Sequence, residues 1–118
     1  MTMLARRPYA WLAVAAILVA APKGIHAETV LVKYRGALDL RPFECEWITR
    51  SSLVKRLCYD RDNHYVVVNL NGTYYHYCAM PPRVVEDWRT AESMGRFFNQ
   101  QVKGHFDCRV STPPDYKG

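Results

Sequence analysis

The sequence contains no apolar run long enough to cross a membrane. The longest, Ala10–Ala21, has twelve residues and as a helix would cover about 18 Å of a hydrocarbon core about 30 Å thick. Arg6-Arg7 precedes the run, Pro22–Gly24 ends it, and the small residue Ala27 follows. This order is typical of a signal peptide. We expect residues 1–27 to be removed by a cut after Ala27, with an uncleaved anchor as the alternative.

The mature chain also lacks a strong charge of either sign. The whole sequence has 16 basic and 11 acidic side chains. Arg6, Arg7 and Lys23 lie in the predicted signal peptide, so cleavage leaves 13 basic and 11 acidic side chains, a net charge of +2. So small a charge does not by itself indicate a nucleic-acid or membrane partner. We expect an exported protein, periplasmic or secreted, with no membrane span after cleavage.

No two cysteines lie close together in the sequence. Cys45, Cys58, Cys78 and Cys108 are separated by 13, 20 and 30 residues, whereas zinc sites typically use C-x-x-C pairs. An even number of cysteines in a small exported chain is typical of disulfides. We expect two disulfides that stabilise one modest core, and no metal or other cofactor.

Strand patterns concentrate before residue 79, and Asn71-Gly72 between two of them favours a two-residue hairpin turn. We expect strands at Phe43–Ile48, Leu53–Tyr59, Tyr65–Leu70 and Thr73–Cys78, after an extended segment, residues 28–50, that holds a further short strand at Val30–Val32.

Helical spacing begins at Pro82. Ser93 is suited to cap a second helix, Gly104 to end it, and Trp88 and Phe98 to anchor both helices in the core. The expected fold is α+β: a three-stranded antiparallel meander packed on one face by two short helices and stapled by two disulfides. Residues 51–108 form the domain, and residues 109–118 a loose tail.

The hairpin register assigns the two faces of the meander. A loop at Asn71-Gly72 pairs residues whose numbers sum to 143, which places Val66, Val68, Leu70, Thr73, Tyr75 and Tyr77 on an apolar face toward the helices. The other face holds Tyr65, Val67, Asn69, Tyr74, His76 and Cys78. It mixes polar and aromatic groups, so we expect it to meet solvent or a ligand.

The meander also bears on the cysteine pairing. Cys58 and Cys78 end strands that are two spacings, about 9–10 Å, apart, whereas a disulfide needs Cα atoms about 4.4–6.8 Å apart. This distance favours Cys45–Cys58 with Cys78–Cys108. The pairing Cys45–Cys108 with Cys58–Cys78 stays open as the rival.

Residues 51–106 resemble the KTSC domain family, which is named for its place at the C-terminus of some lysyl-tRNA synthetases. The likeness rests on Ser51-Ser52, Tyr59-Asp60, the Y-x-Y of Tyr75-His76-Tyr77, Met80-Pro81 and the run Ser93–Asn99. The family has no established function. Its attachment to a tRNA synthetase implies RNA binding by association.

The residue types then suggest where a ligand would bind. We expect Tyr75 and Tyr77 in the core, because they share the apolar face. The candidate binding face consists of Tyr65, Tyr74, His76, Arg56, Arg96 and Lys103. A basic patch assembled from Arg50, Arg56, Arg96 and Lys103 is the alternative to scattered solubilising charges.

No spacing marks a catalytic pair, so we expect a non-enzymatic binding or interaction module of the cell envelope. Its partner is an envelope protein or a polyanion. The second hypothesis is a weak nucleic-acid binder. The third is a small hydrolase in which two of the histidines His64, His76 and His105 act with a lysine, Lys103 or Lys55, in acid–base catalysis.

Overall fold

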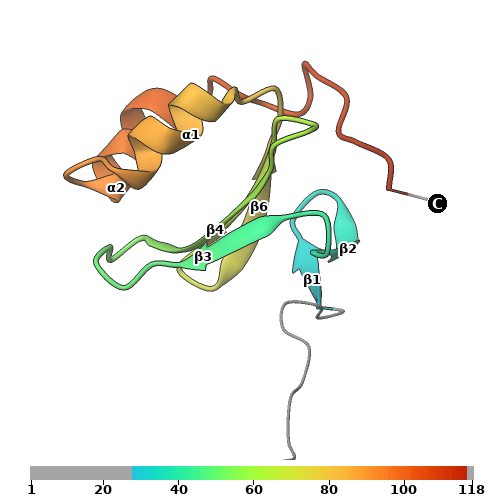
Figure 1. The fold of residues 1–118 in the computed structure, drawn as a ribbon, viewed down its shortest axis with the longest axis horizontal. Coiled ribbons are helices and arrows are strands. Elements are labelled where there is room, and N and C mark those ends of the chain that lie inside the picture. Colours follow the sequence, from blue (N-terminus) through green and yellow to red (C-terminus); the bar gives the residue numbers. More distant parts are fainter. Residues whose placement is uncertain (1–27, 117–118) are drawn as a thin grey trace, which may run out of the picture.

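The computed structural model describes residues 28–116, which form a curved sheet with helices on one face and an N-terminal hairpin on the other (Figure 1). The predicted signal peptide and its cut after Ala27 lie outside the described residues. Within residues 28–116, no helix has the length and apolar character that a membrane span requires.

The sheet has six strands in the order β2-β1-β6-β5-β4-β3. Their bounds are β1 Thr29–Val32, β2 Gly36–Asp39, β3 Glu44–Trp47, β4 Val54–Asp60, β5 Tyr65–Leu70 and β6 Thr73–Tyr77. Neighbours pair antiparallel except β1 and β6, which run parallel. The predicted three-stranded meander is present as β4–β5–β6. The prediction was incomplete, because the meander is half of a six-stranded mixed sheet.

The β5–β6 hairpin has the predicted register. Val66 pairs with Tyr77, Val67 with His76 and Val68 with Tyr75. The turn residues Asn71 and Gly72 have φ angles of 53° and 103°. Positive φ at both positions is what a type I′ turn requires, and it explains why this dipeptide fixes the register.

The helical layer packs on the predicted face. It consists of α1 (Pro82–Arg89), α2 (Met94–Phe97) and a π-helical turn, η2 (Phe98–Val102). Ser93 caps α2 by accepting a hydrogen bond from the Arg96 N–H at 3.1 Å. Trp88 is fully buried, donates its Nε1 hydrogen to the Met94 carbonyl at 3.1 Å and stacks near Phe98. Both predicted anchors therefore lie in the core.

The opposite face of the meander is a second core, and the prediction that it meets solvent or a ligand is wrong for most of its length. Tyr65 and Val67 are fully buried there. They pack with Val32 and Leu38 of the β1–β2 hairpin and with Phe43. Residues 28–50 thus fold into three strands: β1 and β2 pack over this face together with Phe43, whereas β3 extends the sheet beside β4. Burial of apolar side chains favours this packing.

The expected loose tail is ordered as far as residue 116. The Tyr116 ring lies 5.8 Å from the Phe43 ring, and its hydroxyl donates a short hydrogen bond to Asp60. The Pro114 carbonyl accepts a hydrogen bond of 2.8 Å from Arg35. The C-terminal segment therefore completes the second core.

The structure contains the favoured cysteine pairing, Cys45–Cys58 and Cys78–Cys108, with Cα atoms 4.0 and 5.0 Å apart. Cys45 and Cys58 face each other directly across β3 and β4. The rival pairing is excluded, because Cys58 and Cys78 lie on either side of β5 as the meander predicted.

Candidate functional site

The pairing between β1 and β6 is short. It comprises a single residue pair, Val32 with Tyr74, beside which the Lys33 N–H donates to the Tyr74 carbonyl at 2.8 Å. Four residues after Tyr74, just past the end of β6, the Cys78 N–H donates to the Phe106 carbonyl at 2.8 Å. Other chain segments thus hold both ends of this edge of β6, and the stretch between them is open.

His76 lies at the centre of the open stretch. In a two-residue hairpin the pair next to the loop is hydrogen-bonded, and such pairs then alternate with non-hydrogen-bonded ones. Val67–His76 falls in the second class, so the His76 N–H and C=O point away from β5. No residue within 28–116 makes a backbone hydrogen bond to either group.

A hollow of about 750 Å³ lies against this edge. We call it the β6 hollow. Its lining comes from β6, from the β1–β2 turn and from the segment after η2: Tyr34, Tyr75, His76, Tyr77, Lys103, Gly104, Asp107, Cys108, Arg109 and Pro113. The Cys78–Cys108 disulfide ties that last segment to the end of β6, so one wall of the hollow is covalently fixed.

A chain of hydrogen bonds fixes the His76 imidazole. A guanidinium group can only donate, so Arg35 Nη1 donates to the Tyr65 hydroxyl oxygen at 2.9 Å. The Tyr65 hydroxyl and His76 Nδ1 are 2.7 Å apart and share a hydrogen bond whose direction depends on the His76 tautomer. Burial and the nearby Arg35 charge lower the pKa of His76. The bond to Tyr65 engages Nδ1, so Nε2 is the ring nitrogen left for a ligand.

The charges around the hollow are unequal. Asp107 and Arg109 form an ion pair with atoms 2.5 Å apart, and hydrogen bonds from Arg109 lower the pKa of Asp107. Lys103 is exposed and has no ion-pair partner within residues 28–116. After the internal pair cancels, the hollow keeps one free cation.

Tyr34 stands at the rim with 85% of its surface exposed. Its φ angle is 70°, a left-handed conformation that is uncommon for a bulky side chain. Such strain tends to occur at functional sites. Tyr34 was missed among the predicted site residues, because it lies in a segment without clear periodicity.

The predicted binding face is not a single surface. Tyr65 is fully buried behind His76, so it cannot offer a ring to a ligand. His76 and Lys103 line the hollow, whereas Arg96 is an exposed residue of α2 outside it. Tyr75 and Tyr77 are half-buried against the helical layer, where Tyr77 packs on Phe98, and their remaining surface borders the hollow.

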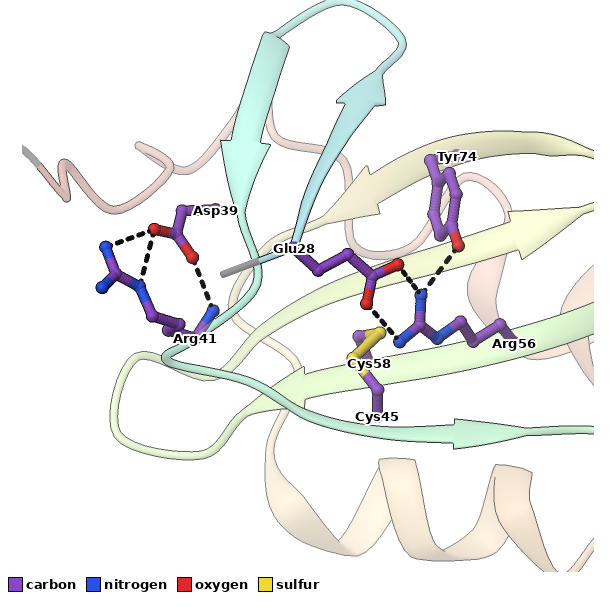
Figure 2. The surroundings of a disulfide bond; sticks show 7 residues. All are labelled: Glu28, Asp39, Arg41, Cys45, Arg56, Cys58 and Tyr74. Carbon is purple, nitrogen blue, oxygen red and sulfur yellow. Dashed lines mark hydrogen bonds and ion pairs between the residues drawn. A yellow bond between two sulfur atoms is a disulfide. The ribbon is translucent and has the colours of Figure 1, made fainter. Parts of the chain in front are cut away.

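Arg56 and Tyr74 belong to a different cluster, shown in Figure 2. Arg56 is 7% exposed and makes two hydrogen bonds to the Glu28 carboxylate, at 2.7 and 2.9 Å, and one to the Tyr74 hydroxyl. Its guanidinium also lies 4.3 Å from the centre of the Trp47 ring. These contacts stabilise the cation internally and raise the Arg56 pKa, chiefly through Glu28.

Two members of the predicted basic patch are bonded within the fold. Arg56 is buried, and Arg50 donates to the carbonyls of Arg89 and Ala91 at 2.6 and 3.0 Å. Neither partner could be predicted from local patterns, since both lie about forty positions away from Arg50. Of the four arginines and lysines proposed for the patch, Lys103 borders the hollow.

A second hollow, of about 380 Å³, lies between β3, β4 and α1. Three of its charged side chains satisfy one another, because Arg89 bonds both Glu46, at 2.7 Å, and Glu86, at 2.8 Å. Glu44 and Arg61 also line it. Residues 28–116 contain no cluster of three or more metal-ligating side chains. Of the three histidines in that range, His76 lines the β6 hollow, while His64 and His105 line neither hollow.

The fold and the hollow define a small α+β domain with a curved sheet, one helical layer and two disulfide-anchored flanking segments. The KTSC domain matches residues 50–106. The sequence is 40% identical over 55 residues to an uncharacterized protein of Stutzerimonas stutzeri, a match that covers 46% of this chain and 78% of that protein. The chain belongs to the KTSC domain family.

Two further proteins are similar to this chain. A lysine–tRNA ligase of Nostoc punctiforme is 34% identical over 56 residues, which are 47% of this chain but only 10% of the ligase. The crystal structure of a KTSC domain protein from Yersinia pestis superposes with a TM-score of 0.51 at 29% identity, covering 55% of this chain and 92% of that one. The chain thus spans a tenth of the ligase's length.

Proposed function

We propose that this protein is an exported binding module of the cell envelope and that the β6 hollow is its ligand site. The observation that carries the proposal is the convergence of three separate chain segments on the open edge at His76. The hollow, about 750 Å³, falls within the usual range for ligand sites, about 300–1,000 Å³. It also has the usual lining, aromatic walls with a few converging polar groups.

Several residues that line the β6 hollow lie outside the KTSC domain, which supports a binding role specific to this chain rather than one shared by the family. Tyr34, Asp107, Arg109 and Pro113 lie outside residues 50–106, which match the KTSC domain. The two disulfides support export, because they indicate an oxidising environment. The four lining residues named above, and one cysteine of each disulfide, lie in the segments that flank the KTSC domain.

RNA binding is less well supported. Stacking of bases needs exposed aromatic faces and a positive groove, but Tyr65 is buried and Arg56 is neutralised by Glu28. Hydrolysis has less support still, since Nδ1 of His76 is occupied by Tyr65 and Asp107 is paired with Arg109.

The test is an NMR screen of the ¹⁵N-labelled mature protein against small carboxylates, amines, sugars and single-stranded poly(U). We expect ligand-induced shifts to cluster at Tyr34, His76 and Lys103 and to disappear in a Tyr34→Ala/His76→Asn variant. Arg89→Gln, in the second hollow, is the control that retains them. Shifts confined to the helical layer, or binding of poly(U) alone with steep salt dependence, would overturn the proposal.

A further inference from the structure

The open edge of β6 differs from an ordinary exposed strand edge. Natural sheets usually protect their edges, because unpaired N–H and C=O groups attract other chains. Here Lys33 and Phe106 occupy the two ends of the edge, and the gap between them exposes one main-chain donor and one acceptor, both on His76. One residue of an added strand could therefore form both main-chain hydrogen bonds with His76.

We propose that the β6 hollow binds an extended peptide segment, which adds as a short strand to β6 at His76 and directs an acidic side chain to Lys103. This inference rests on the proposed function and names its ligand. Strand addition takes its affinity from main-chain hydrogen bonds and its specificity from alternating side-chain pockets. Both parts are present around His76.

The alternation of an added strand fits the two sides of the edge. Successive side chains of β6 point to opposite faces of the sheet. Tyr75 and Tyr77 therefore lie on the side of the helical layer, whereas His76 lies on the side of the β1–β2 hairpin. One side chain of a bound segment would meet the two tyrosine rings, and its neighbour would meet His76 and Tyr34.

Charge selects an acidic segment. Lys103 is the cation of the hollow without an ion-pair partner in the described part of the chain, whereas Arg109 is neutralised by Asp107. In the tautomer in which Nδ1 accepts from the Tyr65 hydroxyl, the His76 ring offers an Nε2–H donor and no acceptor. The free polar side-chain groups of Lys103 and His76 are then donors, and a carboxylate can accept from either.

The experiment uses short capped peptides and the oxidised mature protein. Pools in which one position is fixed at a time are bound to immobilised protein, and the best sequence is resynthesised. Three variants of that peptide are compared: the original, one with its acid replaced by the neutral amide, and one N-methylated at the central residue. Lys103→Gln is the test variant, and Arg96→Gln, an exposed cation outside the hollow, is its matched control.

We expect the pools to select an acidic residue and N-methylation to weaken binding about tenfold, because it removes a main-chain hydrogen bond. Lys103→Gln should weaken the acidic peptide by a similar factor, leave the amide peptide unchanged and differ from Arg96→Gln. An N-methylated peptide that binds as well as the original, or pools with no acidic preference, would overturn the inference.

A small aromatic acid separates this inference from the function on which it rests. If 4-hydroxyphenylacetate shifts the His76 and Tyr34 signals but no peptide does, the hollow is a ligand site and the peptide inference alone fails. If neither probe shifts them in folded protein, both fail. Self-association that depends on protein concentration and blocks peptide binding would assign the edge to a second copy of the chain and overturn the peptide inference.

Discussion

Arg56 shows how a single charged residue is accommodated inside this sheet. Its side chain bonds the Tyr74 hydroxyl and the Glu28 carboxylate (Figure 2). Its guanidinium also lies over the Trp47 ring. Removing one partner of such a pair leaves the other charge without compensation, which costs more than the pair itself contributes. Arg56 is buried and Glu28 is half-exposed, so the loss of Glu28 is the more harmful change.

We therefore predict that Glu28→Gln lowers the free energy of unfolding by about 1–3 kcal/mol. Adding Arg56→Met to that variant should restore part of the loss, because no buried cation then remains. Urea unfolding of the two single variants and the double variant measures the coupling. Asp39→Asn is the matched control, since Asp39 and Arg41 form an exposed ion pair in the same region (Figure 2) and should contribute nothing measurable. Strictly additive effects of Glu28→Gln and Arg56→Met would contradict this account.

A second prediction at this scale concerns the titration of His76. Burial and the Arg35 charge disfavour the imidazolium form, so the His76 pKa lies below its ordinary value of 6.5. The unfolded chain takes up that proton at higher pH than the folded one. The stability that this histidine contributes is therefore present above pH 6.5 and lost as the pH falls.

NMR titration of the His76 ring should give a midpoint below 6.5. Arg35→Met should raise that midpoint, because it removes the nearby cation, whereas Arg96→Met should leave it unchanged. A midpoint that stays in place in Arg35→Met would show that Arg35 does not act on the ring.

At the scale of strands and helices, local sequence predicted the elements that form through local contacts. The Asn71-Gly72 turn fixed the β5–β6 register, and Ser93 capped its helix as expected. β2 escaped prediction, because Gly36–Asp39 contains no β-branched or aromatic residue. The single β1–β6 residue pair joins Val32 to Tyr74. These residues are far apart in the sequence, and periodic patterns do not predict such long-range pairing.

The candidate site was harder to predict for the same reason. His76 and Lys103 were identified by residue type, and both line the hollow. Tyr65 was assigned to a ligand face because the period of two fixes only which face a side chain is on. What covers that face depends on residues 28–50 and on Tyr116, whose docking is a tertiary event. Tyr34 and Arg35 were missed because they lie in a turn without an apolar pattern.

The disulfides connect the flanking segments to the shared core. Cys58 and Cys78 lie within residues 50–106, which match the KTSC domain, whereas Cys45 and Cys108 lie outside them. Their sequence separations are 13 and 30 residues. In the chain-entropy model loops of this size contribute roughly 3 and roughly 3.7 kcal/mol, the longer loop slightly more.

We predict that both double serine variants are destabilised by similar amounts but have different local effects. Cys78→Ser/Cys108→Ser releases one wall of the β6 hollow, so amide exchange at residues 107–113 should accelerate and ligand-induced shifts at His76 should weaken. Cys45→Ser/Cys58→Ser should leave both unchanged under conditions where the variant stays folded. Hydrogen exchange by mass spectrometry provides the measurement, and equal acceleration at residues 107–113 in both variants would contradict the assigned role of Cys108.

For the molecule as a whole, the predicted cut lies directly before Glu28, a residue that is bonded to two distant parts of the fold. Glu28 follows the predicted cut, its carboxylate binds Arg56, and its carbonyl accepts the Leu40 N–H at 2.8 Å. The residue that would become the mature N-terminus is therefore held by the fold. Cleavage several residues later would remove β1 and uncover Tyr65 and Val67, which are now fully buried.

We predict that the full sequence, expressed in a bacterium that exports it, yields a protein whose intact mass corresponds to residues 28–118 less four hydrogens, two for each disulfide. An Ala27→Trp variant should retain its leader, because signal peptidase requires a small residue before the cut.

Residues 28–118 produced without a leader in a reducing cytosol should carry free thiols and lose the stability of both bridges, about 4–8 kcal/mol at about 2–4 kcal/mol each. That loss is comparable to the whole stability of a domain of this size, about 5–15 kcal/mol, so the reduced protein should be largely degraded or insoluble. A stable, soluble and fully reduced protein would show that the sheet and helices suffice without the bridges, and a full-length mass in the membrane fraction would show that residues 1–27 act as an anchor.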